Sequence, residues 1–155
     1  MSIQSKKWAV EVIWWVVTFV ITALIMLPII QANIEFPWLN YNVIYLIAGI
    51  TLVIYIFTLR HHPLAWSKPF KTAMILIVPI LFFPILEGLH SFLEYCDQEG
   101  LQNILTHLPA DRQNWFMKYI RIEYVIAGVT CFMGAFAMII KMIRSLWRQT
   151  KYNQI

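Results

Sequence analysis

Charged side chains are scarce in this chain of 155 residues. Asp, Glu, Lys and Arg make up 13% of it, against roughly 25% in a typical soluble domain. Hydrophobic residues make up 60%, and a soluble fold of this size has no interior large enough to bury so much apolar surface. We therefore expect lipid to be part of the solvent, and the length allows one domain, residues 1–155.

Cysteine and catalytic motifs are scarce too. Cys96 and Cys131 are the two cysteines, and no Cys-x-x-Cys is present, so the sequence offers no residues for thiol–disulfide exchange. Their different predicted depths disfavour a disulfide between them, and we interpret both as small apolar fillers. Because no set of nucleophile and base and no complete metal shell is visible, we expect no enzymatic activity, no cofactor, and no catalytic or metal-binding residue.

Four apolar runs are long enough to cross a bilayer, which takes about 20 residues. They occupy about 8–30, 43–59, 72–92 and 115–143, and the most apolar part of the last run is about 122–140, with Glu123 near its start. Backbone groups in lipid must bond within their own segment, so these runs are predicted to be helices. The first run is too long for the core of a cleavable signal peptide. We predict an all-α polytopic membrane protein with four transmembrane helices in an antiparallel bundle.

The connections between these helices differ in length. The first two are short, which favours antiparallel neighbours. The third, roughly 96–119, is the longest, and Leu101, Ile104, Leu105 and Leu108 recur within it at helical spacing. This pattern predicts a short external amphipathic helix between the third and fourth transmembrane helices.

Charge is distributed unevenly along the chain. Most basic residues fall before the first helix, in the second connection and after the fourth helix: Lys6, Lys7, Arg60, Lys68, Lys71, Lys141, Arg144, Arg148 and Lys151. Most acidic residues fall near the first and third connections: Glu35, Glu87, Glu94, Asp97, Glu99, Asp111 and Glu123. Basic loops stay in the cytoplasm, so both termini are predicted to be cytoplasmic. Four crossings independently require both termini to lie on the same side of the membrane.

Polar residues gather where the third helix ends and the fourth begins. Glu87, His90 and Glu94 share one helical face, and Arg121 and Glu123 are predicted at a similar depth. Charged residues in membrane helices usually face the protein interior or water. Three interpretations of this intramembrane cluster stay open: an ion-paired rim that fixes helix docking, a working proton relay or ligand pocket, and a metal site.

The metal interpretation rests on Glu87-x-x-His90, which is half of a di-iron bundle motif. That motif needs two Glu-x-x-His pairs and two further glutamates, and this chain has one pair. His61 and His62 are expected at the opposite end of the bundle, where they are interpreted as a polar turn. The shell is therefore incomplete.

Three further features inside the spans lead to structural predictions. Glu11 lies one turn after Lys7 and is predicted to reach the inner headgroups, where it can pair with that lysine. Pro79 and Pro84 are predicted to bend the third helix. In the fourth helix, small side chains at four-residue spacing predict a close helix-packing face, used within the bundle or for association with another chain: Ala127, Cys131, Gly134 and Ala135.

These observations favour two hypotheses about function. The first is a non-enzymatic, membrane-embedded subunit or accessory protein of the cell membrane, in particular a bacterial inner membrane, that acts through helix–helix contacts with itself or with partner membrane proteins. The alternative is a small oligomeric channel or proton-coupled transporter that uses Glu87, His90 and Glu123. We expect the lipid bilayer and a homo-oligomer or membrane-protein partner as neighbours, and no nucleic acid.

Overall fold

The computed structural model describes residues 3–58 and 67–152. Its long helices are α1 (Ile3–Gln31), α2 (Leu39–Thr58), α3 (Lys68–Ile80), α4 (Phe82–Gln98) and α5 (Ala110–Tyr152), with one 3-10 turn, η3 (Asn103–Leu105). Four helical stretches are long and apolar enough to cross a membrane, with α3 and α4 together forming the third. The predicted all-helical fold with four such helices is confirmed. Residue 59, Arg60, His61 and His62 lie outside the described residues.

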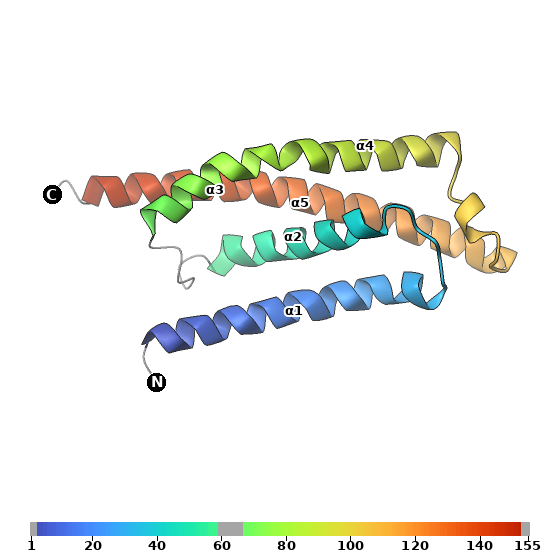
Figure 1. Ribbon diagram of the computed structural model, residues 1–155, viewed down its shortest axis with the longest axis horizontal. Helices are drawn as coiled ribbons and strands as arrows, with labels where there is room; N and C mark the ends of the chain where they lie inside the picture. The colour runs from blue at the N-terminus through green and yellow to red at the C-terminus, as the bar shows by residue number, and fades with distance from the viewer. Residues whose placement is uncertain (1–2, 59–66, 153–155) are drawn as a thin grey trace.

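The helices run back and forth along the long axis of the molecule (Figure 1). Both termini lie at one end, which we call the terminal end; the α1–α2 and α4–α5 connections lie at the other, which we call the loop end. Helix α5 packs against α2, α3 and α4, whereas α1 packs mainly against α2. The longest helix is therefore the central element, and α1 and α4 lie on opposite sides of it.

The third span is broken at Leu81, between the two prolines of the sequence. Pro79 lies inside α3, and Pro84 lies in the first turn of α4. Proline has no backbone N–H, so Pro79 removes one bond of the α3 ladder, whereas Pro84 stands in a first turn, where an N–H has no partner within its own helix. The Leu81 N–H bonds to the Val78 carbonyl instead, at 3.1 Å. At the other end of α3, Ser67 is the N-cap and its hydroxyl accepts from the Phe70 N–H at 3.5 Å.

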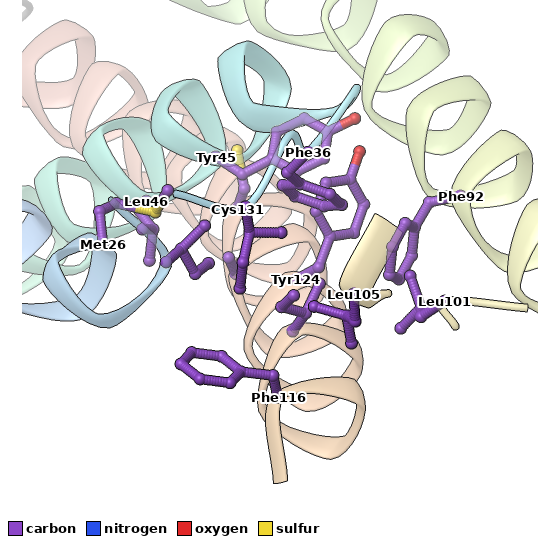
Figure 2. Packing of buried hydrophobic residues seen from close by; sticks show 14 of the residues in the cluster. Met26, Phe36, Tyr45, Leu46, Phe92, Leu101, Leu105, Phe116, Tyr124 and Cys131 are labelled. Carbon is purple, nitrogen blue, oxygen red and sulfur yellow. The ribbon is translucent and has the colours of Figure 1, made fainter. Parts of the chain in front are cut away.

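The main core lies towards the loop end and is rich in aromatic rings (Figure 2). Phe92 of α4 and Tyr124 of α5 are fully buried, with ring centroids 4.1 Å apart. Phe36, from the α1–α2 connection, packs edge-on against both rings at 5.9 Å. Tyr45 of α2 adds a fourth ring, 5.5 Å from Tyr124. This cluster ties three helices to a connection, so it fixes their positions at the loop end.

The third connection differs from its prediction. The external amphipathic α-helix is not confirmed: the described residues there form turns and the short 3-10 helix η3. Leu101 and Leu105 are 5% and 0% exposed, because they insert into the aromatic core. Gly100, at φ +73°, ends α4 in the left-handed conformation that glycine adopts without strain, and its N–H bonds to the Tyr95 carbonyl at 3.1 Å. The chain turns too early for a surface helix to form.

Candidate functional site

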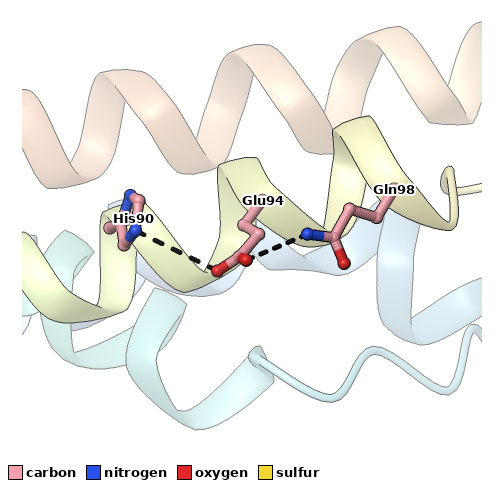
Figure 3. A network of polar contacts seen from close by, with 3 residues as sticks. All are labelled: His90, Glu94 and Gln98. Atoms are coloured by element: carbon pink, nitrogen blue, oxygen red, sulfur yellow. Dashed lines mark hydrogen bonds and ion pairs between the residues drawn. The ribbon is translucent and has the colours of Figure 1, made fainter.

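The outward face of α4 carries a row of polar side chains that we call the α4 stripe: Glu87, His90, Glu94 and Gln98. Gln98 Nε2 donates to Glu94 Oε1 at 2.9 Å, and His90 Nε2 lies 4.0 Å from Glu94 Oε2 (Figure 3). The side chains of His90 and Glu94 are 81% and 53% exposed. The structure therefore brings His90 and Glu94 together on the surface of the bundle.

The inward face of α4 explains why the stripe points outward. Ile85, Gly88 and Phe92 are the buried residues of this helix. A Cβ added at Gly88 would collide with the Tyr45 hydroxyl oxygen, so α4 can approach α2 and α5 at this depth only without a side chain there. The rotation of α4 is fixed by this contact and by Phe92, which leaves Glu87 exposed on the other side.

Glu87 is the deepest member of the stripe. It lies eight residues before Tyr95, which corresponds to about 12 Å along the helix. Tyr95 packs against Trp38 with ring centroids 4.7 Å apart, and aromatic pairs of this kind mark the membrane interface. Glu87 thus lies well inside the part of the third span that hydropathy assigns to lipid.

The other two residues of the predicted cluster lie elsewhere. Arg121 Nη2 lies 3.7 Å from Asp97 Oδ1, and both side chains are largely exposed. Glu123 turns into the bundle, where its Oε2 accepts a hydrogen bond of 2.5 Å from Asn42 Nδ2 of α2. The structure therefore divides the five predicted residues into three groups: the α4 stripe, the Arg121–Asp97 pair and the Asn42–Glu123 pair.

Asn42 has a structural role that sequence reasoning missed. Its side chain is 0% exposed, and Nδ2 also lies 3.6 Å from the Met26 sulfur of α1. The available signal was an amide at the start of the apolar stretch of α2, between Tyr41 and Val43 and two residues after Asn40. A buried amide needs hydrogen-bond partners, so this position pointed to a polar contact between helices.

The face of α1 that packs against the bundle is also polar. Glu11, Thr18 and Thr22 are 9%, 1% and 5% exposed. The Tyr55 hydroxyl of α2 donates to Glu11 Oε1, as does the Trp15 indole N–H at 3.2 Å. The structure thus holds the Glu11 carboxylate against α2. The predicted pairing of Glu11 with Lys7 involves a side chain outside the described part.

A buried cation lies towards the terminal end, and sequence reasoning assigned it only to a cytoplasmic loop. Lys71 of α3 is 1% exposed, and its Nζ donates to the Ser145 hydroxyl of α5 at 2.8 Å. This bond joins the two helices beside the smaller core around Met138 and Met142. It contributes to the docking of α3 on α5.

The predicted helix-packing face of α5 lies against α2. Ala127, Cys131 and Ala135 are 3%, 3% and 2% exposed. A Cβ added at Gly49 of α2 would lie 3.3 Å from the Cys131 backbone nitrogen, and one added at Gly134 would lie 3.1 Å from Leu52 Cβ. Small side chains on both helices therefore permit a close backbone approach within the bundle.

No group of three or more His, Cys, Asp and Glu side chains suited to a metal ion occurs in residues 3–58 and 67–152. Cys96 and Cys131 are both free thiols. Comparison of the chain with protein-family models, with curated proteins and with solved structures finds no match.

Proposed function

We propose that this chain is a membrane-embedded, non-enzymatic accessory subunit whose α4 stripe binds a transmembrane helix of a partner protein. The observation that carries the proposal is the outward position of Glu87, His90 and Glu94 on a helix apolar enough to span a membrane. Ionisable side chains in such helices usually face a protein interior or water. A partner helix on the stripe would provide that interior.

The two faces of α4 differ in how favourable their surroundings are. Its inward face buries Ile85 and Phe92, as expected. An Asp or Lys at the centre of a membrane helix costs about 2.5–3.5 kcal/mol on insertion scales, so a lipid-facing Glu87 is unfavourable. Burying it against a hydrogen-bond donor of another helix offsets this cost, so the stripe supplies a driving force for association.

The partner we propose carries an Arg or Lys side chain in its transmembrane helix. The stripe contains two carboxylates, Glu87 and Glu94, and one histidine, so it is net acidic when the histidine is neutral. A basic side chain complements it in charge and in donors. In a two-fold dimer of this chain, by contrast, a parallel pair of α4 helices would bring like carboxylates together.

The proposed setting is a cell membrane, in particular a bacterial inner membrane, crossed by four antiparallel helices with both termini in the cytoplasm. The charge distribution supports this orientation, because the terminal end carries Lys71, Lys141, Arg144 and Lys151. In this proposed orientation, the α4 stripe lies in the outer leaflet. External labelling of a cysteine introduced at Asn103 in intact cells tests the orientation; labelling only after permeabilisation would reverse it.

The experiment that tests the contact is photo-crosslinking in native membranes. A benzoylphenylalanine at Ser91, which is exposed beside the stripe, is expected to capture one specific partner, identified by mass spectrometry. The matched control places it at Val16 of α1, 55% exposed on an apolar face, where no such adduct is expected. The Ser91 adduct should disappear with Glu87→Gln and Glu94→Gln together.

A charge reversal decides whether the captured protein is the proposed partner. Glu87→Lys should abolish the adduct, and exchanging the basic transmembrane residue of the partner for Glu should restore it. An adduct that contains two copies of this chain, or an adduct unaffected by the charge of residue 87, would overturn the proposal. So would the absence of any adduct at Ser91.

A second candidate is a small oligomeric channel or proton-coupled transporter that uses Glu87, His90 and Glu123. The observation that favours it is the polar interior of α1, where Glu11, Thr18 and Thr22 are buried. Proton flux into proteoliposomes, abolished by both Glu87→Gln and His90→Ala, would support it. An absence of flux from reconstituted protein that is folded would exclude it.

A further inference from the structure

Three buried oxygen atoms near the loop end lack a hydrogen-bond partner. They are Thr22 Oγ1 on α1, Asn42 Oδ1 on α2 and Glu123 Oε1 on α5. None of them has a partner anywhere in residues 3–58 and 67–152. A buried acceptor without a donor costs about 1–3 kcal/mol, so three such atoms from three helices call for an explanation.

Two of these atoms belong to side chains that touch. Asn42 Nδ2 donates to Glu123 Oε2 at 2.5 Å, which holds the amide and the carboxylate together. The amide is fully buried, and the Met26 sulfur of α1 lies 3.6 Å from the same nitrogen. The contact therefore involves all three helices, with α1 next to the pair.

The register of α1 against α5 places Thr22 at the same level. The Tyr119 hydroxyl of α5 donates to the Ile25 carbonyl of α1 at 2.6 Å. The two helices run in opposite directions (Figure 1), so one turn onward from Tyr119 lies beside one turn back from Ile25 and Met26. These positions are Glu123 and Thr22.

The atoms at this level share one chemistry. A carboxylate oxygen and an amide oxygen only accept, and a threonine hydroxyl also has lone pairs to offer. Oxygen ligands of this kind suit hard cations. Glu123 is the one carboxylate among the three, so a single positive charge balances the site, and the complete burial of Asn42 favours a small ion.

We propose that Thr22, Asn42 and Glu123 form a sodium-binding site between α1, α2 and α5. Sodium would supply the positive partner that the orphaned oxygens lack, and it would join α1 to the rest of the bundle. The site is separate from the α4 stripe, since Glu123 faces inward, and it does not depend on the proposed contact function.

The test measures thermal unfolding of the full-length protein in detergent across a sodium chloride series, with choline chloride holding the ionic strength constant. Binding to the folded state alone should raise the midpoint by about 5–10 °C at sodium a hundredfold above its dissociation constant. Potassium chloride should raise it less. A midpoint that follows pH and ignores sodium would overturn the site and leave Glu123 as a proton acceptor only.

Two conservative variants locate the effect. Glu123→Gln and Thr22→Val should each lose most of the sodium-dependent rise. The matched control is Thr18→Val, one turn away on the same face of α1, because the Thr18 hydroxyl already donates to the Trp14 carbonyl at 3.0 Å. Thr18→Val should keep the full rise; an equal rise in all three variants would contradict the assignment.

A direct binding measurement on the unmodified protein gives a result that does not depend on whether a variant folds. Radioactive sodium should bind the unmodified protein at about one ion per chain, and unlabelled sodium should displace it while choline does not. Saturable binding that survives Thr22→Val in a folded protein, or no saturable binding at all, would overturn the proposal.

Discussion

Helices α1 and α4 flank α5 and α2, and they place their polar residues in opposite directions. In α1 the buried positions include Glu11, Thr18 and Thr22, and apolar side chains such as Phe19 and Leu24 are exposed. In α4 the buried positions are Ile85, Gly88 and Phe92, and Glu87 and His90 are exposed. The outside of α1 suits lipid, whereas the loop-end half of α4 has an outside that suits protein or water. The comparison shows that the two outer helices present opposite kinds of surface to their surroundings.

The largest expected effect tests the inward face of α4. Gly88→Val should lower the free energy of unfolding by about 3 kcal/mol or more, because its Cβ would collide with the Tyr45 hydroxyl and overpack the core. Thermal unfolding in detergent measures this loss. Gly100→Ala is not a suitable control because of its positive φ; Ser91→Ala, on the exposed face, should leave the midpoint nearly unchanged.

An intermediate effect tests the polar interior. Asn42→Leu keeps the approximate volume but removes the donor to Glu123 Oε2. Leaving that carboxylate oxygen buried without a partner should cost about 1–3 kcal/mol. The double variant with Glu123→Leu should recover part of the loss, since both polar groups are then gone. A double variant less stable than Asn42→Leu would show that the pair is not coupled in this way.

A substitution in the α4 stripe should have the smallest effect on stability. Glu87→Leu should change the free energy of unfolding of the isolated chain in detergent by no more than about 0.5 kcal/mol, as for other exposed positions. The same substitution should abolish the Ser91 crosslink in membranes. A loss of several kcal/mol in detergent would mean that Glu87 stabilises the bundle itself, and the contrast between α1 and α4 would fail.

The sequence predicted the spans because hydropathy integrates over many residues. It did not predict the rotation of each helix about its own axis, which decides which side chains face the bundle. In α1 the available signal was that Glu11, Thr18 and Thr22 share one helical face, but this spacing does not show which helix that face packs against. The rotation follows from pairwise contacts such as Tyr119 with Ile25 and Asn42 with Glu123, which join residues far apart in the chain.

The same reason explains the division of the predicted polar cluster. Arg121 and Glu123 are two residues apart, so they point to different sides of a helix. Their predicted depth in the membrane put both residues near His90. Only the packing of α5 shows that Arg121 lies near Asp97 while Glu123 contacts α2. The leucines of the third connection were misassigned for a related reason: helical spacing does not reveal that Leu101 and Leu105 enter the core.

The length of α5 has a mechanical consequence. Its 43 residues extend about 65 Å, roughly twice the thickness of the hydrocarbon layer, without a proline in its sequence. A rod of this kind has no joint at which a displacement can be absorbed. A tilt imposed at one end of α5 is therefore transmitted along its whole length, past each of the helices that pack against it.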